Sequence, residues 1–132
     1  MSKRFHLRQE RGQSVAEFAL VLPLIMLVLL GIVQFGMVFK QYITLTDAVR
    51  EGSRKAAVAR HRADRDTYVK GAVVAAASDL GAGFTTTNVS VSSTWTHGED
   101  VTVRATYPFS INIIGIVVHS GTMSSTATER VE

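Results

Sequence analysis

One stretch of the chain decides the fold: residues 18–39 read FALVLPLIMLVLLGIVQFGMVF. These 22 positions contain no Asp, Glu, Lys or Arg. As an α-helix, at about 1.5 Å per residue, they span about 33 Å, which matches the hydrocarbon core of a bilayer. The run is too long for the apolar part of an ordinary secretory signal peptide, and no small-residue cleavage site closes it. We therefore expect residues 18–39 to form a transmembrane helix that is retained in the mature protein.

Positive charge precedes this segment, in the side chains of Lys3, Arg4, Arg8 and Arg11. Basic residues beside a membrane helix stay on the cytoplasmic side, so we expect a cytoplasmic N-terminus and an extracytoplasmic C-terminal part. The chain has a formal net charge of +3, but no basic cluster with interleaved aromatics follows residue 40. Nucleic acid is therefore not an expected partner.

The helix is predicted to continue beyond the membrane, over residues 13–60. Apolar or small residues recur there at spacings of three and four, which is the pattern of one helix face. This face consists of Tyr42, Leu45, Val49, Gly52, Ala56 and Ala59. Glu51 and Lys55 are placed to form an i,i+4 ion pair. Pro23 is expected to bend or loosen the helix, because it removes one backbone hydrogen bond.

Residues 61–132 are expected to form a small ectodomain that begins with a second helix. Asp64 or Asp66 is a suitable N-cap for this helix, and Gly81 is a suitable stop after Leu80. Its predicted buried stripe consists of Val69, Val73, Ala76 and Leu80.

From residue 87 the apolar period changes to two, which is typical of strands. The alternation predicts strands over residues 87–95 and 101–107, joined as an antiparallel hairpin, and the Thr/Ser-rich residues 122–131 suit a third strand. Trp95 is expected to be buried between the sheet and the helices. We expect the apolar patch 111–118 to be core or a short helix covering the sheet, with contact to the outer leaflet or a partner as the alternative.

The predicted fold class is thus α+β. A long N-terminal transmembrane α-helix continues into a small ectodomain, in which a second helix packs on a three- to four-stranded antiparallel sheet. No pattern predicts catalysis: the chain has no cysteine, its four histidines lack metal-ligand spacing, and no Gly-rich phosphate loop is present. We expect no enzyme activity, no cofactor, no metal and no small-molecule substrate.

The junction before the membrane segment, residues 12–18, reads GQSVAEF. A basic leader, Gly12, four residues, Glu17, Phe18 and a membrane helix together resemble the prepilin peptidase site of type IV pilin-like proteins. The resemblance implies removal of leader residues 1–12 by cleavage between Gly12 and Gln13, with Glu17 and Phe18 acting in assembly and recognition. A glycine lets the chain approach a protease in extended form. A carboxylate near the bilayer needs a cation, which in pilin-like assemblies is thought to be the new amine of a neighbouring subunit.

Further segments resemble the TadE-like family: AVREGSR at residues 48–54, EFALVLP at residues 17–23 and TYPF at residues 106–109. The resemblance implies a pseudopilin, a minor pilin-like structural subunit in the assembly of a tight-adherence (Flp) type IV pilus or a related secretion apparatus. The implied location is the bacterial cytoplasmic membrane, spanned once. The implied partners are prepilin peptidase, other pilin-like subunits and the pilus assembly platform.

Two alternatives stay open at this point. The chain could be an uncleaved, single-pass anchored module whose ectodomain binds a partner outside the cell, with Glu17 lying among headgroups. The small-residue face around Gly52 is expected to pack against the chain's own second helix, with an intersubunit contact as the alternative. Arg50, Glu51 and Arg54 are expected to form a solvated, salt-bridged face.

Overall fold

The computed structural model describes the backbone of residues 6–132 and the side chains of residues 12–132. Lys3 and Arg4, and the side chains of Arg8 and Arg11, lie outside the described part. The elements are α1 (His6–Ala57), α2 (Arg65–Ala76), the 3-10 turns η1 (Ser78–Leu80) and η2 (Thr86–Asn88), β1 (Val89–Ser93), β2 (Asp100–Ile113) and β3 (Ile116–Arg130). The predicted α+β class, with a long apolar first helix, a second helix and an antiparallel sheet, is confirmed.

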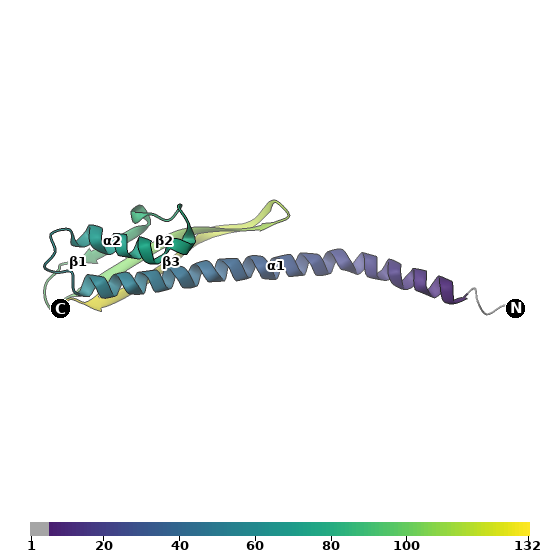
Figure 1. Ribbon diagram of the computed structural model, residues 1–132, viewed down its shortest axis with the longest axis horizontal. Coiled ribbons are helices and arrows are strands. Elements are labelled where there is room, and N and C mark those ends of the chain that lie inside the picture. Colours follow the sequence, from purple (N-terminus) through teal and green to yellow (C-terminus); the bar gives the residue numbers. More distant parts are fainter. Residues whose placement is uncertain (1–5) are drawn as a thin grey trace.

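Helix α1 is a single helix of 52 residues, about 78 Å long at ~1.5 Å per residue. It runs through both Gly12 and Pro23, and Figure 1 shows it as one gently curved rod with the ectodomain beside its C-terminal half only. The part from Gly12 onward is apolar enough to cross a membrane, and none of its most apolar window is buried inside the protein. The core helix of a soluble domain passes the same test of composition, but such a helix would be buried.

The helix ends at Ala57, three residues before the predicted end. The chain turns there through a hydrogen bond from the Ala59 N–H to the Ala56 carbonyl, at 3.1 Å. The Ala57 carbonyl instead accepts a hydrogen bond from the backbone N–H of Glu132, at 2.9 Å. A backbone group distant in sequence therefore satisfies a carbonyl that the helix end leaves free.

The core lies where α1, α2 and one face of the sheet meet. The predicted α1 face is confirmed for Leu45, Val49, Gly52, Ala56 and Ala59, which are all buried. Tyr42 was wrongly included, since it is 45% exposed and lines an open cleft at the margin of the ectodomain.

Helix α2 buries Val69 and Val73, and the stripe continues through Ala77 rather than the predicted Ala76, which is exposed. Residues four apart share a helix face, and Ala77 is four residues after Val73. Leu80 is also buried, but from η1, because α2 ends at Ala76.

The predicted cap of α2 by a carboxylate is wrong for Asp64. Asp64 occupies the N-cap position, but its side chain makes no capping hydrogen bond. Both carboxylate oxygens instead accept hydrogen bonds from Arg62, from Nε at 3.0 Å and from Nη2 at 3.1 Å. Asp64 therefore forms a bidentate ion pair with Arg62, two residues earlier, in place of a capping hydrogen bond. Asp66 lies in the first turn of α2.

The sheet has three antiparallel strands in the order β1-β2-β3. The hairpin and the third strand are confirmed, although β2 and β3 are longer than predicted. Val101, Val103 and Ala105 face the helices and are fully buried. The opposite face is polar, and on it the hydroxyls of Thr102 and Thr128 lie 3.0 Å apart. The ectodomain therefore has two helices on one face of the sheet and solvent on the other.

The expectation that residues 111–118 form core or a helix is wrong. They form the end of β2, a two-residue turn at Ile114 and Gly115, and the start of β3. Ile111 is buried, but most of the patch is exposed, because the β2–β3 hairpin projects beyond α2, alongside the charge-free part of α1 (Figure 1).

Candidate functional site

Gly12 occupies an open position on α1. A Cβ added there would meet no heavy atom within 4 Å, and the backbone has ordinary helical geometry. A glycine inside a helix is less favourable than alanine by about 1 kcal/mol. Neither packing nor a left-handed conformation requires Gly12, so the fold of this chain gives no reason for a glycine here.

Gln13 and Glu17 lie one turn apart on the same exposed segment. The Gln13 side-chain amide donates a hydrogen bond from Nε2 to Oε1 of Glu17, at 3.0 Å. Phe18, the next residue, is 61% exposed. The structure therefore places Gly12, Gln13, Glu17 and Phe18 within two turns of one helix, away from the ectodomain (Figure 1).

Glu17 begins the charge-free part of α1. The next charged residue along the chain is Lys40, 23 positions later and about 35 Å away along the helix axis at ~1.5 Å per residue. A carboxylate at a bilayer boundary needs a cation or water. No residue between Glu17 and Lys40 can supply a cation, so any cation that pairs with Glu17 comes from the leader side, the membrane surface or another molecule.

The block at residues 48–54 has a packing role within the chain. A Cβ added to Gly52 would overlap the side chain of Val73, so Gly52 permits the close approach of α1 and α2. Ser53 is buried, and its hydroxyl donates to the Arg50 carbonyl at 2.8 Å. The expectation that this face packs on the chain's own second helix is confirmed.

The charged residues of the block point outward. Arg50 lies 3.7 Å from Asp47, and Glu51 lies 3.5 Å from Lys55, which is the i,i+4 pair that the sequence predicted. Arg54 is exposed. The solvated, salt-bridged face is therefore confirmed for Arg50 and Glu51, and solvent exposure is confirmed for Arg54.

Trp95 is not in the core, contrary to prediction. It follows β1, which ends at Ser93, and it has a φ of 58° with a partly buried side chain. Its backbone N–H donates to the Ser93 hydroxyl at 3.0 Å. The period-two pattern that includes Trp95 therefore extends past the last paired residue of the strand.

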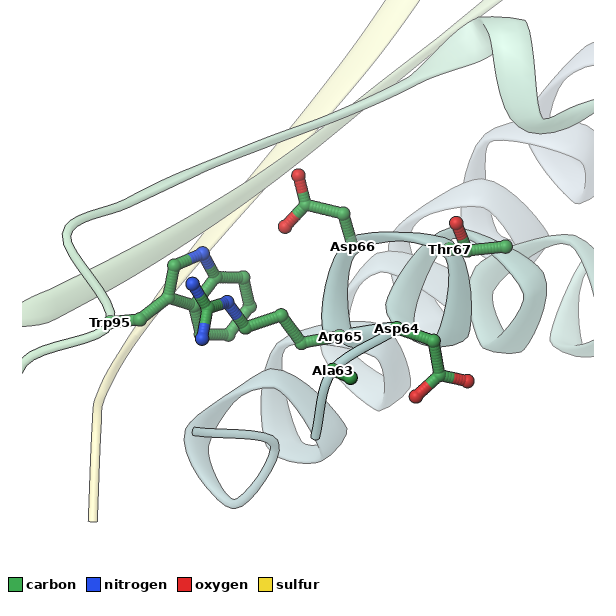
Figure 2. A pocket seen from close by; sticks show the side chains of 6 residues that line it. All are labelled: Ala63, Asp64, Arg65, Asp66, Thr67 and Trp95. Atoms are coloured by element: carbon green, nitrogen blue, oxygen red, sulfur yellow. The ribbon is translucent and has the colours of Figure 1, made fainter. Parts of the chain in front are cut away.

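Trp95 and the start of α2 enclose a shallow cleft of about 260 Å³. The Arg65 guanidinium carbon lies 5.3 Å from the centre of the Trp95 ring, a cation–π arrangement that Figure 2 shows from close by. The carboxylates of Asp64 and Asp66 lie on opposite sides of the helix start (Figure 2). The hydrogen bond from Arg62 holds the pKa of Asp64 below its usual value. Sequence patterns gave no indication of this cleft, since it joins a helix start to a loop distant in sequence.

The described part of the chain holds no cluster of three or more His, Cys, Asp or Glu side chains suited to a metal ion. Residues 12–54 match the family model described as TadE-like protein. The match covers both the Gly12–Phe18 junction and the Gly52 block, so the resemblance seen in the sequence is confirmed for this segment. No curated protein and no solved structure matches the chain.

Proposed function

Because residues 12–54 are TadE-like, a family match that implies a pilin-like subunit associated with the Tad pilus, we propose that the chain is a minor pilin-like structural subunit, a pseudopilin. It acts in the assembly of a tight-adherence (Flp) pilus or a related secretion apparatus, without enzyme activity of its own. Helix α1 anchors it in the bacterial cytoplasmic membrane, with the N-terminus inside and residues 61–132 outside. A prepilin peptidase cleaves it after Gly12.

One observation carries the proposal: Gly12 and Glu17 lie on a helix segment that the rest of the chain does not cover. A bilayer around this segment explains its apolar residues but neither a glycine nor a carboxylate. A peptidase that binds the chain in extended form explains the glycine, since Gly12 loosens the helix and presents no side chain. A neighbouring subunit that offers a cation explains Glu17.

Cleavage would create that cation. The new amine of Gln13 lies at the start of the mature helix, at the same depth as Glu17 of a neighbour displaced by about one turn. Removing one member of a desolvated charged pair leaves the other unmatched, which costs several kcal/mol. Assembly should therefore depend on both the amine and the carboxylate, whereas membrane insertion should depend on neither.

The first test is the mature N-terminus, determined by mass spectrometry of protein from its native host. We expect Gln13 at the N-terminus of the wild type and the full leader on Gly12→Val. The added Cβ meets no heavy atom within 4 Å, so we expect the substitution to leave membrane insertion intact. If most wild-type protein keeps the leader while the peptidase is present, the proposal is wrong and the chain is an uncleaved anchored module.

The second test is complementation of a deletion strain, scored by surface pili, with membrane levels checked by immunoblot. We expect Glu17→Gln to be inserted and cleaved but inactive. Gln13→Ala is the matched control, since it removes the 3.0 Å side-chain hydrogen bond to Glu17 but leaves the new amine in place. It should retain function. Full rescue by Glu17→Gln at normal abundance rules out charge pairing.

The orientation has its own test. An exported reporter enzyme fused after Glu132 should be active, and a strictly cytoplasmic reporter at the same point should be inactive. The opposite result reverses the proposed topology.

A further inference from the structure

The tip of the β2–β3 hairpin is apolar and uncovered. The exposed fraction is 78% for Ile114, 70% for Ile116, 57% for Val117 and 62% for Val118. The hairpin also contains no Asp, Glu, Lys or Arg over the 24 positions 105–128. A contiguous apolar patch at a projecting turn marks an interaction site rather than an ordinary solvated surface.

The turn itself uses an unusual residue. Ile113 pairs with Ile116, and the two residues between them, Ile114 and Gly115, both have positive φ, 51° and 81°. Two-residue turns of this kind favour Asn-Gly, and a β-branched residue at positive φ is disfavoured. Backbone geometry and contact with water both argue for a polar residue at position 114. An isoleucine there indicates that the turn is not in water.

A β-bulge interrupts the register close to the tip. The register of β2 and β3 shifts between Ile111, which pairs with His119, and Asn112, which pairs with Val117. Val118 is thus left without a partner in β2. Residues 114–120 are all exposed, so neither face of the tip is covered by the chain.

The tip points along α1 toward the charge-free half of that helix (Figure 1). At the base of the projecting part an open apolar cleft of about 300 Å³ separates the hairpin from α1. The cleft is lined by Phe35, Val38, Phe39, Tyr42, Phe109 and Met123. Since Phe35 and Phe39 belong to the expected transmembrane segment, the base of the hairpin already lies beside the end of that segment. Ile114 is five residues beyond Phe109, or about 17 Å at ~3.3 Å per residue.

We propose that the tip, residues 113–118, inserts into the outer leaflet of the same membrane that α1 spans, while the base of the hairpin, beside Phe39, stays at the membrane surface. The ectodomain is then attached to the bilayer at two points instead of one. Two points of attachment restrict its rotation about α1 and set its tilt. This inference rests on α1 being a membrane helix and not on the pilin-like role.

Charge placement favours lipid over a protein partner. Both segments that enter the bilayer lack charged residues, and the first charged residue after the α1 run, Lys40, pairs with Asp79 of η1 at 3.4 Å. Both side chains of this pair are exposed, which suits the headgroup region. A specific protein interface needs a polar rim with directed hydrogen bonds. The exposed tip, residues 114–118, consists of apolar side chains and one glycine, which suits a fluid apolar phase.

Backbone hydrogen bonding limits the depth of insertion. β1 pairs with β2 only as far as Ala105, and β3 is an outer strand, so both edges of the projecting hairpin carry unpaired N–H and C=O groups. Such edges are costly in hydrocarbon. The turn and its flanking residues therefore enter the leaflet, and the rest of the hairpin stays in the interfacial region, where water and headgroups satisfy its edges.

The absence of cysteine from the chain allows a direct test with single-cysteine variants. The full-length protein is reconstituted in phosphatidylethanolamine/phosphatidylglycerol vesicles and spin-labelled at Val117→Cys. Collisions with oxygen, which concentrates in hydrocarbon, are compared with collisions with a water-soluble nickel chelate. Ile32→Cys in the apolar half of α1 is the membrane reference, and Thr126→Cys, exposed on the same strand β3, is the water reference.

We expect the oxygen-to-nickel ratio at Val117 to be several-fold higher than at Thr126 and close to that at Ile32. A second substitution, Ile116→Asp, should withdraw the tip from the membrane and make the Val117 label accessible to the nickel chelate. It should leave the thermal unfolding temperature unchanged, because the turn lies outside the core. A Val117 label as accessible to nickel as Thr126 overturns the proposal. So does a label shielded from both reagents that shows dipolar broadening with another copy, since the tip would then bind protein.

Discussion

The contact between Gly52 and Val73 gives the sharpest test of how the ectodomain is held on α1. In Gly52→Ala the new methyl group overlaps the side chain of Val73, which is fully buried, and lies 3.7 Å from the side chain of Val103. Alanine favours the helix over glycine by about 0.5–1 kcal/mol. Overpacking a filled core costs about 1–3 kcal/mol. Because Val73 is fully buried, we expect the cost of overpacking to exceed the gain in helix propensity, with a net loss of about 1–2 kcal/mol.

For a domain of this size that loss lowers the melting temperature by roughly 4–15 °C, at about 4–8 °C per kcal/mol. The assay is thermal unfolding of the full chain in detergent, followed by fluorescence of Trp95. Trp95 is the sole tryptophan of the chain, and its ring lies against Arg65 at the start of α2, so it reports the separation of α2 from the loop after β1. Gly71→Ala is the matched control, because Gly71 lies in α2 with nothing within 4 Å of an added Cβ. It should raise stability by about 0.5–1 kcal/mol.

A double variant tests the contact itself. Val73→Ala removes the atom that the new methyl group meets, so Gly52→Ala should be much less harmful in that background, with a coupling energy of about 1 kcal/mol or more. If Gly52→Ala instead melts at or above the wild-type temperature while Gly71→Ala behaves as expected, the contact is loose. The close approach of α1 and α2 would then not require a glycine at position 52.

Two further predictions concern the start of α2. Trp95→Ala should destabilise the ectodomain by about 1–2 kcal/mol in chemical denaturation, because the variant loses a partly buried ring and its cation–π contact with Arg65. Truncation of a fully buried tryptophan costs ~3–5 kcal/mol, and a loss of that size would place the ring in the core. The pKa of Asp64, measured by NMR, should lie below the usual aspartate value and return to it in Arg62→Gln. Since the folded-state pKa is depressed, the stabilisation exists above the unfolded-state pKa and is lost as the pH falls through the folded one; an unchanged Asp64 pKa in Arg62→Gln contradicts this assignment.

Periodicity predicted the parts of the fold that obey one local rule over many residues. The three- and four-residue spacing from Leu45 to Ala56 identified the buried face of α1, and alternation identified the paired strands. Periodicity failed where the outcome depends on which of several possible partners a residue takes. Nothing local indicates that pairing of β1 stops at Ser93, and Asp64 could cap α2 or pair with Arg62 on equal sequence evidence.

The prediction for the apolar patch 111–118 was wrong for a different reason. A short apolar run fits a buried strand, a buried helix or an exposed surface equally well, and its turn lacks the Asn or Asp that marks a hairpin. The candidate cleavage site, in contrast, is recognisable in the sequence but not in the fold. A linear motif read by another protein is visible in sequence, and the folded chain shows only that Gly12 and Glu17 are accessible and have no packing role of their own.

The TadE-like segment divides into two halves that need different explanations. Between Leu45 and Arg54 the chain's own packing accounts for the residues present, since Gly52 and Ser53 lie against α2 and the sheet. Between Gly12 and Phe39 the chain's own core covers almost nothing. A bilayer accounts for the apolar residues there, but any long apolar sequence would satisfy a bilayer. Neither the fold nor the lipid requires Gly12 or Glu17, and the proposed recognition by a peptidase and by a neighbouring subunit would account for both. The variants at these two positions therefore separate a pilin-like subunit from a plain anchor.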